Sequence, residues 1–159
     1  MQTDRADIVV RTATRGDAAA LYELNRDFNG VDATTADRVA AALEATAGEI
    51  VFVAETNGQV VGFVCAQIAT SFCYARRYAE ISEVYVAPRA RRRGIARAMI
   101  AHAERYCAQR YAIGSFSLKT GSCNRAAQAL YRKIGYRRAR EIVMRKRLSD
   151  AHGDTDSAE

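Results

Sequence analysis

The apolar residues of this chain fall into short runs, many of them rich in valine, isoleucine and aromatic side chains. Such runs, when turn-forming residues bound them, are typical of β-strands. Asn57-Gly58 separates two of the runs, and because both residues tolerate positive φ, the pair predicts a tight hairpin. Pro88 follows another run and cannot donate to a strand ladder, so it predicts the end of that strand. Strands are therefore expected over residues 7–14, 49–55, 59–69, 79–86, 114–120 and 141–148.

Elsewhere the apolar residues recur every three or four positions, which is the spacing of one face of a helix. Thr14-Arg-Gly-Asp17 resembles a capping box at the start of the first helix. Asn124 is a favourable N-cap for the last helix, and Gly135 is a favourable residue just beyond its end. The four helices are expected from Asp17 to about Phe28, from Thr34 or Thr35 to before Gly48, over 94–110 and over 124–135.

The order β-α-α-β-β-β-α-β-α-β predicts one α/β domain with a mixed sheet, over residues 1–148. A chain of 159 residues, 49% hydrophobic and 26% charged, has the composition of a soluble globular protein. The last eleven residues, 149–159, are predicted to form a disordered tail. No apolar run approaches the roughly 20 residues that a membrane span needs, and no hydrophobic segment follows the acidic N-terminus, so a cytoplasmic location without membrane association is expected.

The cysteine pattern predicts neither a zinc site nor a disulfide framework. The four cysteines show no CxxC spacing, and the chain has only two histidines. Ordinary core or surface thiols are the favoured interpretation of Cys65, Cys73, Cys107 and Cys123, and no bound metal is expected.

Charge is distributed very unevenly along the chain. Residues 1–57 hold ten acids and five arginines, net −5, whereas residues 58–148 hold four acids and nineteen Lys/Arg, net +15. The final eleven residues carry four acids, net −4. The basic half is suited to an anion, although a solvated surface or nonspecific affinity for nucleic acid would give the same composition.

The basic stretch is densest at the predicted junction between the strand 79–86 and the helix 94–110. A glycine-bearing turn from a strand into a helix directs several free backbone N–H groups and the positive helix end at one point, and a diphosphate fits there. Gly94 and Ala96 would let the phosphates approach the backbone, while further charge comes from Arg91, Arg92, Arg93 and Arg97. The loop is neither GxxxxGK[ST] nor GxGxxG.

These residues resemble the pyrophosphate loop of the GCN5-related N-acetyltransferase (GNAT) family, written Q/R-x-x-G-x-G/A. Arg91 to Ala96, with Ile95 between Gly94 and Ala96, matches that loop, and Val84-Tyr85-Val86 matches the strand end that precedes it. A second block, from Asn124 through Tyr131 to Tyr136, matches N-x-x-A-x-x-x-Y-x-x-x-G-F/Y. The resemblance implies the acyl-CoA N-acyltransferase fold, with a mostly antiparallel central sheet flanked by helices. It further implies acetyl-CoA as acetyl donor and a primary amine as acceptor.

Direct acetyl transfer needs a base, because an alkylammonium with a pKa near 10.4 must lose a proton before its nitrogen attacks. Glu80 and Glu83 lie on the predicted strand, and their odd spacing predicts opposite faces, so that only one faces the cleft. In the family a glutamate at the place of Glu80, or of its same-face neighbour Ser82, often acts as base, which favours Glu80. A water chain, or a purely electrostatic role for either residue, remains an alternative.

The resemblance also assigns roles around the thioester. The tyrosine matching Tyr131 protonates the departing thiolate, the asparagine matching Asn124 contacts the CoA arm, and the backbone of Val84 to Val86 pairs with that arm as an added strand would. Packing is the alternative for Tyr131, because Ala127, Leu130 and Ile134 give its helix an apolar face.

The identity of the acceptor amine is the part of the predicted function that the sequence specifies least. In the family the first two helices and the loop between them commonly wall the acceptor side. Here this part of the chain carries acids that would attract a cationic amine, either a small molecule or a peptide amine: Glu23, Asp27, Asp32, Asp37 and Glu44. Solvated helix faces would explain the same acids.

A homodimer is expected from the family's habits, with residues 141–148 pairing across an interface. The alternative functions are a non-catalytic acyl-CoA sensor and, less favoured, a basic nucleic-acid-binding module.

Overall fold

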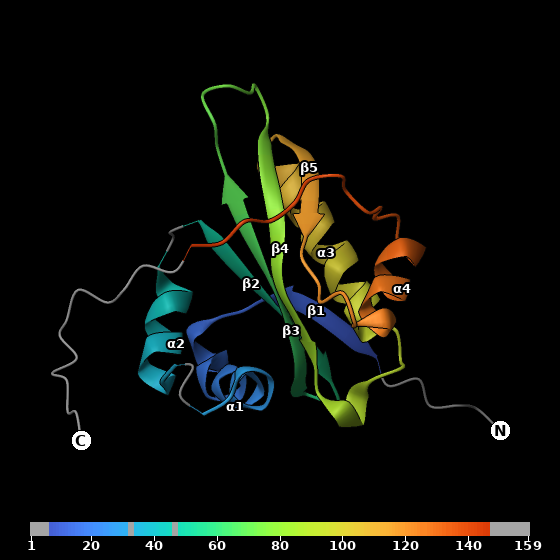
Figure 1. The fold of residues 1–159 in the computed structure, drawn as a ribbon. Coiled ribbons are helices and arrows are strands. Elements are labelled where there is room, and N and C mark those ends of the chain that lie inside the picture. Colours follow the sequence, from blue (N-terminus) through green and yellow to red (C-terminus); the bar gives the residue numbers. More distant parts are fainter. Residues whose placement is uncertain (1–6, 32–33, 46–47, 147–159) are drawn as a thin grey trace, which may run out of the picture.

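The computed structural model describes residues 7–31, 34–45 and 48–146. Its centre is one five-stranded sheet in the order β1-β2-β3-β4-β5, so every strand pairs with its neighbour in the sequence. The first three pairings are antiparallel, and only β4 and β5 run parallel. This confirms the mixed, mostly antiparallel sheet with flanking helices (Figure 1). The strands are β1 (Ile8–Thr12), β2 (Glu49–Thr56), β3 (Gln59–Ala69), β4 (Arg77–Val86) and β5 (Ile113–Leu118).

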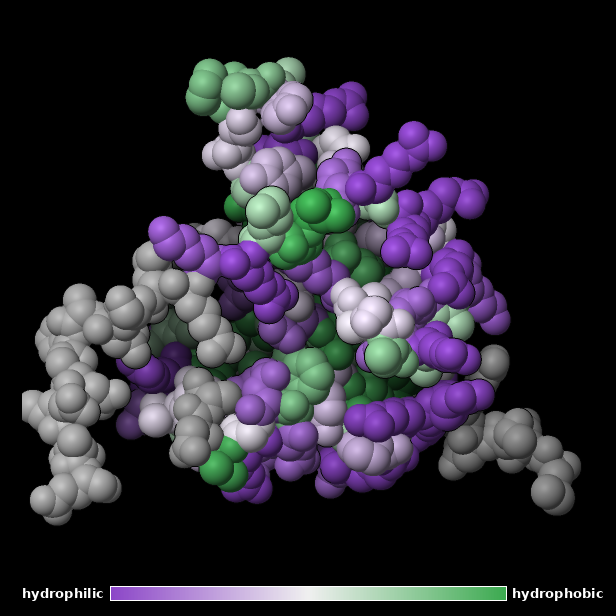
Figure 2. Space-filling model, in the orientation of Figure 1, coloured by the Kyte–Doolittle hydropathy of each residue, from purple (hydrophilic) through white to green (hydrophobic). Residues whose placement is uncertain are grey.

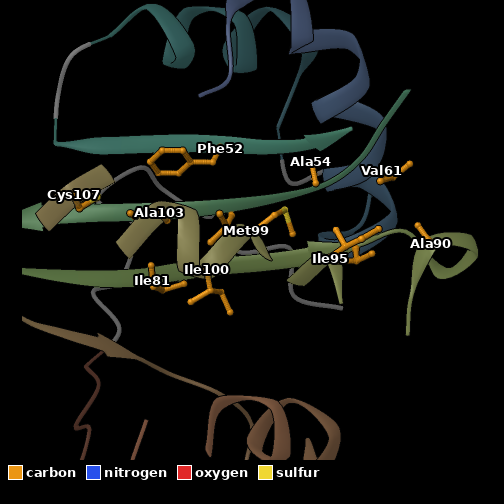
Figure 3. Packing of buried hydrophobic residues seen from close by; sticks show 13 residues of the cluster. Phe52, Ala54, Val61, Ile81, Ala90, Ile95, Met99, Ile100, Ala103 and Cys107 are labelled. Atoms are coloured by element: carbon orange, nitrogen blue, oxygen red, sulfur yellow. The ribbon is translucent and has the colours of Figure 1, made fainter. Parts of the chain in front are cut away.

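Helices cover both faces of the sheet. Buried residues of α1 pack with Val53, Phe63 and Tyr85 on one face, and buried residues of α3 pack with Phe52, Ile81 and their neighbours on the other. Figure 3 shows the α3 side chains Ile95, Met99 and Ile100 directed at the strands. The helices are α1 (Ala18–Asn29), α2 (Ala36–Glu44), α3 (Ile95–Arg110) and α4 (Arg125–Lys133), with short 3-10 turns η1 (Arg15–Asp17) and η2 (Pro88–Ala90).

The turns and helix ends follow the sequence signals closely. Asn57 and Gly58 have φ values of 52° and 73°, as a tight two-residue hairpin requires. Thr35 rather than Thr34 caps α2, because its hydroxyl accepts the Arg38 N–H at 3.3 Å. Gly135 has a φ of +105° just beyond α4, a conformation that residues with a Cβ rarely adopt.

The predicted final strand over 141–148 is wrong for its described part, because residues 141–146 contain neither helix nor strand. Strand formation depends on a partner edge more than on intrinsic propensity. Within the described residues the sheet ends at β5, and this segment leaves Ile142, Val143 and Met144 exposed. Residues 147–148 and the predicted tail over 149–159 lie outside the described residues. The homodimer stays a prediction.

An ion-pair cluster joins the first strand to the first helix. Asp17 is only 6% exposed, and its carboxylate accepts bonds from Arg11 Nη1 at 2.8 Å and Nη2 at 2.7 Å. It also accepts the Thr14 N–H at 2.7 Å, and Arg11 bonds to Glu55 on β2 as well. The Arg11 guanidinium, in particular, lowers the pKa of Asp17 to about 2 despite the opposing effect of burial.

Replacing Asp17 with asparagine should destabilise the fold by about 2 kcal/mol, because it leaves Arg11 without its main partner and weakens the start of α1. A carboxylate with a lowered folded pKa stabilises the protein above its unfolded pKa, so this contribution should be lost as pH falls from about 4 to about 2. Urea unfolding at pH 7 and at pH 3 measures both effects. The exposed Asp37→Asn is the control, and equal stability of the two variants would contradict the assignment.

Candidate active site

A gap in the sheet marks the candidate site. The pairing of β4 with β5 runs from Arg77 to Ile81 and stops there, although β4 continues to Val86. The last five residues of β4 therefore have β3 on one side and no paired strand on the other within the described residues. In Figure 2 apolar surface is recessed between polar side chains in the middle of the view, where Figure 1 places the lower part of β4.

Backbone groups line this gap. Ala87 N–H donates to Val61 O at 2.9 Å, so Ala87 directs its backbone toward β3. Because successive residues of a strand alternate, Val86 and Val84 direct their N–H and C=O groups the other way, into the gap. Val86 O accepts Arg91 Nε at 2.8 Å. The predicted backbone segment thus lies at an unpaired edge that can take another extended chain.

The gap leads to the N-terminus of α3. Gly94 is the N-cap residue, with φ +81°, and it places no side-chain cap on the first turn. The first turn of a helix has backbone N–H groups without intrahelical partners, and they carry the positive end of the helix dipole. A Cβ on Gly94 would meet no protein atom within 4 Å, so the space over the loop is open.

The arginines of the loop divide into two kinds. Arg91 is tied to the protein, since it bonds to Val86 O and its guanidinium lies 5.7 Å from the centre of the Tyr85 ring. The side chains of Arg92, Arg93 and Arg97 are exposed around the open space. Arg91 therefore fixes the end of β4, while the other three can meet an anion.

Glu80 and Glu83 lie on the same face of the sheet, so the prediction of opposite faces is wrong. Ile81 pairs with Ala66 and Glu83 pairs with Cys65, which leaves Ser82 as an extra residue in β4. This β-bulge shifts the alternation by one position. The two glutamates consequently share the face that α1 covers, whereas Ile81 and Val84 both pack on the α3 side.

The two carboxylates differ in their surroundings. Glu80 accepts Lys119 Nζ at 2.6 Å, so it is held in an ion pair. Glu83 makes no ion pair within the described residues. Partial burial raises the pKa of Glu83, and the negative charge of Glu49 raises it further. Because Glu83 is not held in an ion pair by the described residues, it is the better placed of the two to accept a proton.

Tyr131 lies on the opposite side of the gap. It packs against the α3-side core, its ring centre 6.2 Å from that of Tyr136. Burial raises the pKa of Tyr131, so the phenol keeps its proton at neutral pH. Its hydroxyl makes no hydrogen bond to the described residues. Asn124 Oδ1 accepts the Ala127 N–H at 3.1 Å as the N-cap of α4, and Asn124 is an exposed residue.

Sequence reasoning missed Glu49, on β2, and the bulge that brings Glu83 onto its face. A signal for the bulge was present: apolar residues occupy positions 79 and 81, then 84 and 86, so the alternation changes phase at Ser82. Glu49 carries no comparable signal, because its proximity to Glu83 depends on the pairing of β2, β3 and β4. Gln67 Nε2 bonds to Glu49 Oε1 at 3.3 Å on this face.

The acids predicted for the acceptor side are partly neutralised. Glu23 pairs with Arg26 on α1, and Glu44 pairs with Arg15. Asp27 and Asp37 are exposed, and Asp32 lies outside the described residues. None of the helices that the structure describes is both long and apolar enough to cross a membrane.

Comparisons with known proteins agree with this geometry. The model of the Acetyltransferase (GNAT) family matches residues 18–136. The uncharacterized N-acetyltransferase YhfO of Bacillus subtilis is 29% identical over 132 residues, which cover 80% of this chain and 88% of that protein.

Among solved structures, an aminoglycoside acetyltransferase from an uncultured soil metagenomic sample, in complex with sisomicin, has a TM-score of 0.79 at 15% identity, covering 94% of this chain and 100% of that one. A ribosomal-protein-alanine N-acetyltransferase from Brucella melitensis biovar Abortus has a TM-score of 0.75 at 19% identity, covering 89% and 100%. At these identities the likeness shows the fold. Because the family model spans most of the sequence, from α1 to just beyond α4, the chain belongs to the GNAT family and is an acetyl-transferring enzyme.

Proposed function

We propose that this enzyme transfers the acetyl group of acetyl-CoA directly to a primary amine, with a cationic amine as the natural acceptor. The observation that carries the proposal is the gap between β4 and β5, which leads from the free backbone of Val84 and Val86 to the uncapped N-terminus of α3. An extended amide-bearing arm fits the first part, and a diphosphate fits the second.

The residues around the gap fit this donor. Arg92, Arg93 and Arg97 would surround the diphosphate, and the first-turn N–H groups of α3, from Ile95 to Arg97, would bind its oxygens. The amide nitrogen of Asn124 is available to the arm from the other wall. When bound, acetyl-CoA supplies an activated acyl group as a thioester.

Two residues on opposite faces of the gap would move the protons. Glu83, on the α1 face, would accept the proton of the acceptor ammonium, directly or through one water, which frees the nitrogen to attack. The C–N bond then forms as the C–S bond breaks, and the thiolate leaves toward the α4 face, where Tyr131 would donate its phenolic proton. The amide nitrogen gives up its second proton to solvent, and a solvent proton restores the phenol of Tyr131. Proton transfer from a phenol to a thiolate is mildly uphill in free energy. Because the base and the acid lie on opposite faces of the gap, the two proton transfers are separated in space.

The acceptor class is inferred from the charges around Glu83. Glu49 and Glu83 lie on the α1 face close enough to influence each other, and two carboxylates favour a cation over a neutral or anionic acceptor. The aminoglycoside acetyltransferases with the same fold support polycationic amines as candidates. The ion pairs of Glu23 and Glu44 leave the α1–α2 acids a smaller role than their number suggests.

Calorimetry with acetyl-CoA tests donor binding, and we expect a dissociation constant well below 1 mM for the wild type. Gly94→Asn should weaken binding by at least about tenfold, because asparagine tolerates positive φ but places a side chain where the diphosphate would lie. Arg93→Ala, which removes only one exposed cation, is the control and should cost less. Wild-type protein that binds no acetyl-CoA at near-millimolar concentration would refute the proposal.

A further inference from the structure

The hairpin between β3 and β4 projects beyond the rest of the sheet (Figure 1). The pairing of β2 with β3 reaches only Gln67, and the pairing of β4 with β5 begins at Arg77. Residues 70–76 therefore have no paired strand on either side within the described residues. At about 3.3 Å per residue, Arg77 lies about 23 Å along β4 from Val84, so the hairpin is well separated from the proposed donor site.

Three aromatic side chains of this hairpin face solvent. Phe72 is fully exposed, Tyr74 is 73% exposed and Tyr78 is 44% exposed. Figure 2 shows apolar surface at the far end of the projection, with polar side chains below it. Aromatic rings stabilise a fold mainly when they are buried. Because these three gather in one short segment and stay exposed, they indicate a surface that contacts something outside the fold.

Cations lie beside these rings. Arg76 and Arg77 are exposed in the same hairpin, and Arg77 N–H donates to Ala112 O at 3.1 Å. The Arg77 guanidinium lies 5.8 Å from the centre of the Tyr111 ring. Arg110, which precedes Tyr111 in the chain and ends α3, is exposed as well. The turn between α3 and β5 thus adds a third cation at the base of the hairpin.

Acids are missing from both segments. No aspartate or glutamate occurs between Glu55 and Glu80, or between Glu104 and Glu141. Glu80 is itself neutralised by its ion pair with Lys119. The exposed aromatic and basic residues of the hairpin together form the tip surface: Phe72, Tyr74, Arg76, Arg77 and Tyr78.

The chemistry of the tip surface fits a single-stranded nucleic acid. Unpaired bases stack on aromatic rings and on guanidinium planes, and the phosphates between them pair with arginine. A duplex offers its phosphates but keeps its bases stacked on one another, so it would leave the rings unused. A lipid bilayer fits less well, because even a myristoyl chain gives only marginal membrane binding, and Phe72 is the one ring of the tip surface without a hydroxyl.

We propose that the tip surface binds single-stranded RNA, with bases stacked on Phe72 and Tyr74 and phosphates paired with Arg76 and Arg77. RNA is favoured over DNA because its 2′-hydroxyl can bond to the exposed tyrosine hydroxyls. This binding goes beyond the proposed acetyl transfer and does not depend on it.

The test measures the fluorescence anisotropy of a labelled, unstructured RNA strand of about ten nucleotides, titrated with the full chain at about 0.1 M salt. We expect a dissociation constant on the order of 10 μM for the wild type, within the range of sequence-independent binding. Phe72→Leu should weaken binding about tenfold, because leucine stays apolar but has no ring on which a base can stack. Phe72→Tyr is the matched control and should stay within about twofold of the wild type.

The dependence of the affinity on salt tests the role of charge. Arg76→Gln should lower the slope of log Kd against log salt by about 0.7, the contribution of one phosphate contact on a single strand. Arg132→Gln removes an exposed arginine of α4, bonded to Gln128 at 3.2 Å, and should keep the wild-type slope. Arg93→Gln should keep it too, because the tip surface is separate from the proposed diphosphate site.

Equal binding of the single strand and of a duplex of the same sequence would overturn the inference, because it would reduce the attraction to charge alone. Full affinity in Phe72→Leu would overturn it as well, and so would a loss in Arg93→Gln as large as in Arg76→Gln. A DNA strand of the same sequence should bind several-fold more weakly, and equal affinity would contradict the choice of RNA. Binding to phosphatidylserine vesicles in place of RNA would identify a membrane surface instead. Acetyl transfer, measured in parallel, should be unchanged in Phe72→Leu, so failure of RNA binding would leave the proposed function standing.

Discussion

Glu83→Gln is expected to lower kcat/KM for acetyl transfer by about a hundredfold, the usual loss when a general base is removed. Glutamine keeps the size of the side chain but cannot accept the ammonium proton. Acetyl-CoA affinity should not change, because Glu83 lies on the α1 face and the proposed diphosphate site is at α3. Glu80→Gln is the matched control on the same strand and face; since Glu80 is paired with Lys119, its loss should cost far less.

The pH dependence of kcat/KM distinguishes a general base from a residue that acts only through its charge. Burial and the charge of Glu49 raise the pKa of Glu83, so the acidic limb of kcat/KM should fall at a higher pH than that of an ordinary carboxyl group. Glu49→Gln removes the like charge and should shift that limb to lower pH. Rates of Glu83→Gln that match the wild type across the pH range would exclude Glu83 as the base.

Tyr131→Phe should lower kcat by about ten- to a hundredfold, because the leaving thiolate loses its proton donor. The dissociation constant of acetyl-CoA should stay within about twofold, since phenylalanine keeps the packing of the ring against Tyr136. Tyr111→Phe, at the C-terminal end of α3, is the control. If Tyr131 only packs, kcat should be unchanged in Tyr131→Phe, because phenylalanine keeps that packing. The melting temperature is measured alongside turnover to verify that the fold is retained.

Most of the fold could be predicted because its signals are local. The turn at Asn57-Gly58, the strand end before Pro88 and the caps at Asn124 and Gly135 each act within a few residues of chain. The loop from Arg91 to Ala96 was found for the same reason, as its glycine and its charges are contiguous. The parallel pairing of β4 with β5 is consistent with the intervening helix, since parallel strands need a crossover connection.

The parts that could not be predicted depend on contacts between distant segments. The bulge at Ser82 changed which face Glu83 occupies, and the Lys119 ion pair changed which glutamate is available. The segment after α4 has strand-forming residues, yet strand formation needs a free edge in the right register, which local sequence does not encode.

Catalysed transfer of acetyl from acetyl-CoA to an amine can be tested by measuring thiol release over a panel of amines. The panel pairs polycations such as polyamines and aminoglycosides with neutral amines of similar size, at about 0.01 M and 0.1 M salt, where the Debye length falls from about 30 Å to about 10 Å. We predict amine-dependent release that is fastest for a polycation, weakens with salt and falls sharply in Glu83→Gln, with acetylated amine formed in equal amount. Tight acetyl-CoA binding with thiol release at the uncatalysed rate for every amine would exclude catalysed acetyl transfer and indicate an acyl-CoA sensor.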